Sequence, residues 1–162
     1  MSETPTSGET NIADSRILVV DDNLQNLELI VAYLDSLGCK VDTATDGPEA
    51  LEKIQAEDFD LILLDVMMPK MSGFEVCSKL KSDPRTRGIP VIMVTALNEL
   101  TDIERGIANG TDDFVSKPVN RLELLTRVRS LLRVSHLQSE LDRTLAYLSE
   151  VEARQAGERD SE

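Results

Sequence analysis

The feature that most constrains the fold is a regular alternation of short apolar runs with segments of helical spacing. There are five such runs, and in three of them, which are rich in Val, Ile and Leu, the apolar residues are nearly continuous. Continuous apolar strands are buried on both faces, which is typical of a parallel sheet covered by helices on each side. The expected strands are Arg16–Val20, Lys40–Ala44, Asp60–Leu64, Pro90–Val94 and Asp112–Ser116.

The segments between these runs predict helices. Apolar residues recur three and four positions apart, and Gly, Pro, Asn or Asp marks most of the ends. The expected helices are Asn23–Leu37, a segment from Asp46 through about Gln55, Phe74–Leu80, Leu100–Ala108 and a last helix that begins near Val119. Right-handed crossovers then favour a flavodoxin-like (βα)5 doubly wound parallel sheet of strand order 2-1-3-4-5, with an extended C-terminal helix.

Composition narrows the class of protein. The chain has 162 residues and a formal net charge of −13, so binding to a nucleic-acid backbone by bulk electrostatics is not expected. The N-terminus lacks the apolar core of a signal peptide, and no apolar run approaches the length of a membrane span. Cys39 and Cys77 show no paired spacing. These features predict a cytoplasmic protein that contacts neither nucleic acid nor membrane.

The chain divides by composition into four parts. Residues 1–15 are expected to form a disordered N-terminal arm, 16–134 the globular domain, 135–156 a projecting helix and 157–162 a disordered tail. The projecting helix has apolar residues at three-four spacing, which favours a coiled coil and a homodimer over a helix that folds back or frays. These residues are Val134, Leu137, Leu141, Leu148 and Val151, and Leu145 lies just off the pattern. The lone histidine, His136, is interpreted as a surface residue.

Polar residues follow four of the five expected strands, at the end where ligands bind in such sheets. Asp21 and Asp22 follow the first strand, Asp65 the third, Thr95 the fourth and Lys117 the fifth. Three carboxylates held together need a cation, and hard oxygen ligands suit Mg²⁺. Lys117 can hold a phosphoryl oxygen, and Thr95 can donate a hydrogen bond to one. The set predicts a phosphoryl group carried on an aspartate.

Each residue also has an ordinary structural interpretation. Asp22 is as well explained as a helix cap as it is by metal binding. Thr95 alone would be a turn residue, and Lys117 alone a solvated lysine. Asp65 is harder to explain in this way, because a carboxylate at the end of an apolar strand does nothing for stability. The occurrence of polar residues at several strand ends therefore favours the functional interpretation.

Four segments carry a resemblance to a known family: ILVVDDN, DLILLDVMMPKMSGFEV, IPVIMVTA and GTDDFVSKP. Together they resemble the receiver domain of bacterial response regulators, over about Ser15 to Val134. The resemblance implies phosphoryl transfer to Asp65 from a sensor histidine kinase or a phosphotransfer protein. It implies Mg²⁺ bound by Asp22, Asp65 and the backbone carbonyl of Met67, with Asp21 acting through water.

The same resemblance implies a conformational switch and a cis peptide bond. Thr95 and Phe114 would be the switch pair, Lys117 would contact the phosphoryl group, and Lys117–Pro118 would be cis. The protein would then signal to a downstream target by conformational change or dimerisation, and catalyse only its own phosphotransfer and dephosphorylation. No output module is recognisable after Val134, so a single-domain regulator and a fragment of a longer one are both open.

The sequence departs from the family pattern in two respects. Ser72 stands where an aspartate is usual, and little effect is expected because Gly73 still provides the turn. Met67 and Leu97 are apolar and cannot orient an attacking water, so we expect a long-lived aspartyl phosphate. Two other classes are less favoured: a metal-dependent phosphatase would want an acid where Met67 stands, and the intact Asp22, Asp65 and Lys117 argue against a scaffold that is not phosphorylated.

Overall fold

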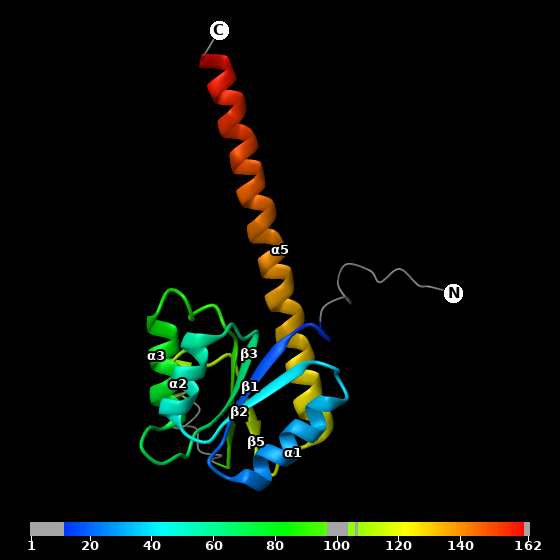
Figure 1. Cartoon of the computed structure of the whole chain (residues 1–162), viewed down its shortest axis with the longest axis vertical. Helices are drawn as coiled ribbons and strands as arrows, with labels where there is room; N and C mark the ends of the chain where they lie inside the picture. Colours follow the sequence, from blue (N-terminus) through cyan, green and yellow to red (C-terminus); the bar gives the residue numbers. More distant parts are fainter. Residues whose placement is uncertain (1–11, 97–103, 106, 161–162) are drawn as a thin grey trace, which may run out of the picture.

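A single five-stranded parallel sheet forms the centre of the protein. The computed structural model describes residues 12–96, 104–105 and 107–160. The strands lie in the order β2-β1-β3-β4-β5, which confirms the predicted topology (Figure 1). All four strand pairings are parallel. The strands are β1 (Arg16–Val20), β2 (Lys40–Ala44), β3 (Leu61–Asp65), β4 (Val91–Thr95) and β5 (Asp113–Ser116).

Helices connect the strands, and side chains cap their N-termini. The side chains of Asn23, Asp46 and Ser72 accept hydrogen bonds from backbone N–H groups in the first turns of the helices that follow them. The helices are α1 (Leu24–Asp35), α2 (Gly47–Ala56), α3 (Gly73–Ser82) and α5 (Arg121–Asp160). Most of the helix expected at Leu100–Ala108 lies outside the described residues.

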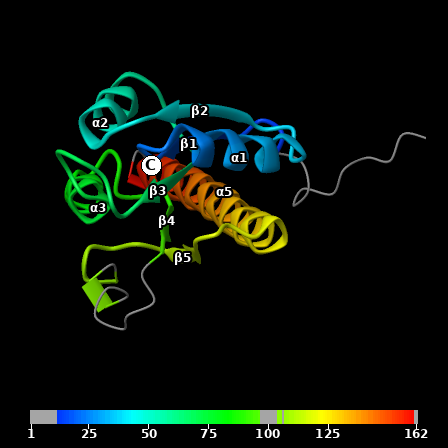
Figure 2. The same cartoon turned by 90° about the horizontal axis from the view of Figure 1, so that it is seen from below.

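Each face of the sheet carries its own apolar core. Alternate residues of a strand point to opposite faces, so Leu18 and Val20 join one core while Ile17 and Val19 join the other. Helices α2 and α3 cover the first face, and α1 and α5 cover the second (Figure 2). This three-layer arrangement explains why the inner strands β1, β3 and β4 are largely apolar, whereas the edge strands β2 and β5 carry several polar residues.

Three strands begin one residue later than expected, each for a local reason. The Asp60 carboxylate accepts a hydrogen bond from the Arg16 N–H group at 2.8 Å, so Asp60 joins the start of β1 through its side chain just before β3 begins. Pro90 has no N–H group to donate to a strand ladder. The Asp112 carboxylate accepts a hydrogen bond from the Val91 N–H group at 2.7 Å, so Asp112 joins the start of β4 through its side chain just before β5 begins.

The N-terminal arm is shorter than the sequence analysis predicts. Ile12 packs against the core beneath α1 and α5, and Ser15 is buried. The carbonyl of Ser15 accepts a hydrogen bond from the Lys40 N–H group at 3.0 Å, which continues the pairing of β1 with β2. The assignment of residues 12–15 to a disordered arm is therefore wrong, because tertiary contacts stabilise a stretch that is polar in composition.

Helix α5 is the longest element and leaves the domain. It begins near the carboxyl edge of the sheet, packs beside α1, and projects beyond the opposite edge (Figure 1). It continues through Gly157 to Asp160, past the point where the sequence analysis ends it, since extending an existing helix over one glycine costs only about 1 kcal/mol. Among the helices in the described part of the chain, none combines the length and apolar character needed to cross a membrane.

His136 is not a simple surface residue. It lies where α5 leaves the domain, is half-buried, and its Nε2 lies 3.1 Å from the Ser15 hydroxyl oxygen. The sequence analysis placed it at the surface because helical spacing alone does not show that the N-terminal segment crosses α5 at this height. The contact joins two segments 121 positions apart in the chain.

Candidate functional site

Three carboxylates meet at the carboxyl edge of the sheet. Asp65 is the last residue of β3, and Asp21 and Asp22 directly follow β1. One oxygen of each lies within 4.8 Å of the others. Asp21 and Asp65 are almost completely buried, whereas Asp22 is exposed. The structure thus brings together the three acids that the sequence analysis proposed as a group, with two inside and one at the mouth.

Lys117 lies against the two buried carboxylates. Its Nζ is 3.3 Å from Asp21 Oδ2 and 3.2 Å from Asp65 Oδ1. Burial acts to lower the pKa of Lys117, but the charges of Asp65 and Asp21 outweigh burial and raise it, so the ammonium group stays protonated. The Lys117–Pro118 peptide bond is cis, as expected, and the Lys117 N–H group donates to the Thr95 carbonyl at 2.8 Å.

One ammonium group does not neutralise this site. Burial raises the pKa of Asp65 from its ordinary 3.8 to about 6, and the neighbouring charge of Asp21 adds to the rise. Lys117 and the Met67 N–H group, which donates to Asp65 Oδ1 at 3.3 Å, act in the opposite direction without cancelling it. The site therefore retains an excess of negative charge that a further cation would stabilise.

One oxygen of Asp21 also indicates that the site lacks positive charge. Its Oδ2 is buried and has no hydrogen-bond partner within the described residues, although Lys117 Nζ lies 3.3 Å away. The contact is an ion pair without hydrogen-bond geometry, so this oxygen still has room for a further ligand. A buried carboxylate oxygen without a donor is costly. An oxygen-rich cluster with such an atom fits a divalent cation of the Mg²⁺ type.

The helix cap near this site is Asn23 and not Asp22. The Asn23 side chain accepts from the N–H groups of Gln25 and Asn26 at 2.9 and 3.2 Å. Its own N–H group donates to Asp21 Oδ1 at 2.9 Å, which orients that carboxylate. The capping interpretation of Asp22 is therefore wrong, and its position at the mouth of the site needs another explanation.

The remaining predicted residues surround the acids. Thr95 ends β4, beside the strand that carries Asp65, and is buried. Phe114 lies on β5 opposite Met93 and packs, half-buried, against the core beneath α2 and α3. The Met67 side chain is 66% exposed at the start of the loop after β3. Leu97 lies outside the described residues.

Gly73 packs directly against the backbone of Asp65, and the sequence analysis did not predict this contact. Its N–H group donates to the Val66 carbonyl at 2.9 Å, and a Cβ at this position would overlap the Asp65 carbonyl oxygen. The sequence analysis assigned Gly73 only a turn. Gly73 is the first residue of α3, directly after the helix cap Ser72, and the local sequence carries no signal of the close approach to Asp65.

Comparison with known proteins agrees with this geometry. The family model of the response regulator receiver domain matches residues 17–129. Response regulator PleD of Caulobacter vibrioides is 49% identical over 127 residues, which cover 78% of this chain and 28% of that protein. The alkaline phosphatase synthesis transcriptional regulatory protein PhoP of Bacillus subtilis is 41% identical over 124 residues, which cover 76% of this chain and 51% of that protein. The chain thus spans about half or less of these two relatives.

Solved structures show the same fold. A response regulator receiver domain protein (CheY-like) from Methanospirillum hungatei superposes with a TM-score of 0.72 at 32% identity, over 76% of this chain and 98% of that one. A chemotaxis protein, CheY4 of Vibrio cholerae, gives a TM-score of 0.69 at 32% identity, over 72% of this chain and 98% of that one. Both comparisons leave about a quarter of this chain uncovered.

Proposed function

The chain belongs to the response regulator receiver family of two-component systems, and from this premise we propose that Asp65 is its phosphoryl acceptor. The observation that carries the proposal is the placement of Asp65 between the buried Asp21 and Lys117, at the end of the central strand. A phosphoryl group needs charge neutralisation and positioning more than covalent assistance. Lys117 Nζ, 3.2 Å from Asp65 Oδ1, supplies positive charge, and the oxygens of Asp21 and Asp22 within 4.8 Å can position a cation.

The donor would be a phosphohistidine of a sensor histidine kinase or a phosphotransfer protein. The P–N bond breaks as a carboxylate oxygen of Asp65 forms the new P–O bond, and the imidazole leaves with the electron pair of the broken bond. Asp65 must be ionised to attack, and its pKa of about 6 leaves it mostly ionised at neutral pH. Lys117 Nζ, 3.2 Å from Asp65 Oδ1, is close enough to hold an oxygen of the incoming group.

Asp21, Asp22, Asp65 and the backbone carbonyl of Met67 would hold the metal ion. Mg²⁺ would supply positive charge to the transferring phosphoryl oxygens. The unsatisfied oxygen of Asp21 and the exposed position of Asp22 support this assignment, because one demands a cation and the other lies at the mouth by which a hydrated ion would enter. Family membership supports it independently.

The response would use Thr95 and Phe114. Attraction of the Thr95 hydroxyl to the phosphoryl group would vacate space on β4, and the half-buried ring of Phe114 on β5 would turn into it. The chain would then act as a signalling domain that catalyses only its own phosphotransfer and dephosphorylation. Apolar Met67 cannot orient a hydrolytic water, which favours a long-lived aspartyl phosphate.

The remaining proposals concern organisation and location. Residues 16–134 would be the receiver domain and 135–156 a projecting helix that pairs with a second copy. The protein would act in the cytoplasm, through a downstream protein target, without direct contact to nucleic acid or membrane. The exposed apolar residues of α5 support the dimer, and the net charge of −13 supports the absence of direct nucleic-acid binding.

Phosphorylation with a small donor tests the central proposal. Acetyl phosphate with Mg²⁺ should add one phosphoryl group to the intact protein, and removal of Mg²⁺ with EDTA should prevent the addition. Lys117→Ala should slow the labelling, whereas Lys79→Ala, a change on α3 away from the acids, should not. Labelling that is independent of Mg²⁺ and unaffected by Lys117→Ala would contradict the proposal.

A further inference from the structure

The outer part of α5 presents an apolar stripe that the described part of the chain leaves uncovered. Five aliphatic side chains along it are between 49% and 60% exposed. They are Val134, Leu137, Leu141, Leu145 and Leu148. Spacings of three and four residues place them on one face of the helix. A helix this long gains most of its stability from packing such a face, so the stripe requires a partner.

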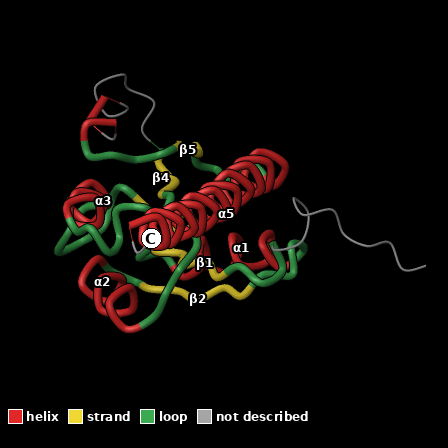
Figure 3. Tube along the Cα trace, turned by 90° about the horizontal axis from the view of Figure 1, so that it is seen from above, coloured by secondary structure: helices red, strands yellow, loops and turns green. Residues whose placement is uncertain are grey.

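Most of the stripe lies on a face of α5 turned from its own domain, and Val134, the stripe residue nearest the domain, also lines a groove beside it. Leu125 and Leu132 are buried against the sheet. Val134 lies nine positions after Leu125, and Leu141 lies nine positions after Leu132. Nine residues of an α-helix turn through about 900°, which is two full turns and about 180°. A second helix can therefore lie along the outer part of α5, which extends beyond the domain in Figure 1 and is seen from its C-terminal end in Figure 3.

The spacing of the stripe fits a helix of the same kind. Val134, Leu141 and Leu148 lie seven residues apart, and Leu137, Thr144 and Val151 form the second series of the heptad. This is the pattern of a two-stranded coiled coil, in which each side chain packs between four of the partner. A second copy of this chain offers the matching series without any further assumption.

We propose that two copies pair through α5 in parallel and in register, with Val134 through Val151 of one chain against the same residues of the other. The proposal rests on the dimer given under the proposed function and adds its direction, its register and a contact that distinguishes it from the reverse arrangement. Because α5 begins four residues after Lys117, this seam is the far end of a helix that starts beside the phosphoryl acceptor.

Charge decides the direction. Arg133 precedes the stripe, is exposed, and has no hydrogen-bond or ion-pair partner within the described residues. In a parallel pair the residue before a first heptad position faces the residue five further on in the partner, here Gln138. The Gln138 amide donates to Asp142 Oδ1 at 3.4 Å, so the guanidinium would reach an amide oxygen and a carboxylate together. Antiparallel pairing with Val134 against Val151 would instead bring Arg133 next to the exposed Arg154.

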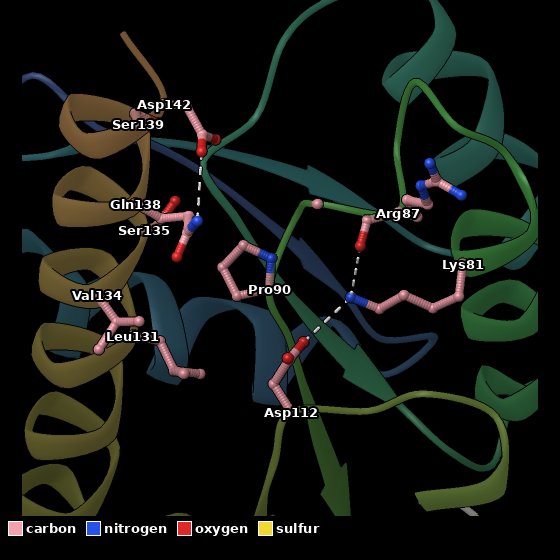
Figure 4. A pocket seen from close by; sticks show the side chains of 11 residues that line it. Lys81, Arg87, Pro90, Asp112, Leu131, Val134, Ser135, Gln138, Ser139 and Asp142 are labelled. Carbon is pink, nitrogen blue, oxygen red and sulfur yellow. Dashed lines mark hydrogen bonds and ion pairs between the residues drawn. The ribbon is translucent and has the colours of Figure 1, made fainter. Parts of the chain in front are cut away.

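A groove beside the stripe gives this contact room. It has a volume of about 320 Å³ and lies between α5 and the segment that leads into β4 (Figure 4). Gln138 and Asp142 line its α5 wall. On the opposite wall the Lys81 ammonium group already bonds to two backbone carbonyls and Asp112, so it does not compete for Asp142. The partner's guanidinium would lie at the mouth of this groove.

Disulfide formation tests direction and register. Leu137→Cys in a Cys39→Ser, Cys77→Ala background should give a covalent dimer on mild oxidation, because parallel pairing sets the two thiols opposite each other. In the antiparallel arrangement Leu137 faces Leu148, and the thiols would be about 16 Å apart along the axis, beyond disulfide reach. Ser139→Cys, on the groove side of the helix, is the matched control and should not cross-link.

Charge reversal at Arg133 is an independent test, because it should change the dimer dissociation constant in opposite directions for parallel and antiparallel pairing. Arg133→Glu should weaken the dimer about three- to tenfold if the pair is parallel, because glutamate would face Asp142. It should strengthen an antiparallel dimer by pairing with Arg154. Arg129→Glu, an exposed reversal of equal charge off the stripe, should change neither. Sedimentation equilibrium measures the dissociation constant.

The outcomes separate the direction from the dimer itself. A dimeric mass without a Leu137→Cys disulfide, or a tighter dimer in Arg133→Glu, would overturn the parallel arrangement and leave the dimer standing. A monomeric mass at high micromolar concentration would overturn both. Neither result bears on Asp65, whose labelling is measured separately.

Discussion

Replacing Asp65 with asparagine should stabilise the metal-free domain at neutral pH. The carboxyl is 2% exposed, and burial together with the charge of Asp21 raises its pKa from 3.8 to about 6. A carboxyl whose pKa is higher in the folded than in the unfolded state contributes stability that is fully present below pH 3.8 and is lost as pH rises through 6. A shift of about two units corresponds to about 3 kcal/mol at pH 8.

Urea unfolding with EDTA present measures this difference. At pH 8 the free energy of unfolding of Asp65→Asn should exceed that of the wild type by up to about 3 kcal/mol, because the asparagine keeps the shape and removes the charge. At pH 4 the two proteins should differ little. Added Mg²⁺ should narrow the gap at pH 8 by binding the folded wild type.

The control is Asp58→Asn, which removes one charge at an exposed position without a hydrogen bond or ion pair in the described part of the chain. It should change stability by less than about 0.5 kcal/mol at either pH. An Asp65→Asn protein no more stable than the wild type at pH 8, or a gap of equal size at both pH values, would refute the claim that uncompensated charge dominates this site.

Three further substitutions test separate parts of the account. Gly73→Ala should destabilise the fold by about 1–3 kcal/mol in urea, because its Cβ overlaps the Asp65 carbonyl oxygen, while Gly157→Ala, in open space on α5, should not destabilise it; equal effects would contradict the close approach. Lys117→Ala should raise the pKa of Asp65 further, by about one unit or more, in a carboxyl ¹³C NMR titration; an unchanged value would mean that the ion pair contributes little. Met67→Asn should shorten the life of the aspartyl phosphate, followed by phosphate release, and an unchanged lifetime would show that this position does not limit hydrolysis.

Much of the fold follows from local pattern. Solid apolar strands such as β1 and β3 can only be buried on both sides, so their parallel pairing is predictable before any contact is known. The acidic site follows as well, because the topology places the ends of β1 and β3 side by side. Asp21, Asp65 and Lys117 are therefore predictable as a group although they lie far apart in the chain.

The parts that could not be predicted depend on tertiary contacts that leave no periodic signal. Ser15 and His136 meet only because the N-terminal segment crosses α5, and nothing in either local sequence encodes that crossing. Asn23 caps α1 because the helix begins at Leu24 and not one residue earlier. Patterns of apolar residues do not determine a helix start to within one residue. The tight packing of Gly73 on Asp65 is visible only once both backbones are in place.

Identification of the modified residue tests the central claim most directly. The protein is labelled with acetyl phosphate and Mg²⁺, reduced with borohydride to trap acyl phosphates, digested, and the peptides are sequenced by mass spectrometry. We expect modification of Asp65 alone in the wild type, and no modification anywhere in the Asp65→Asn protein. Modification at Asp21, Asp22 or another residue in the wild type, or undiminished labelling of Asp65→Asn, would contradict it.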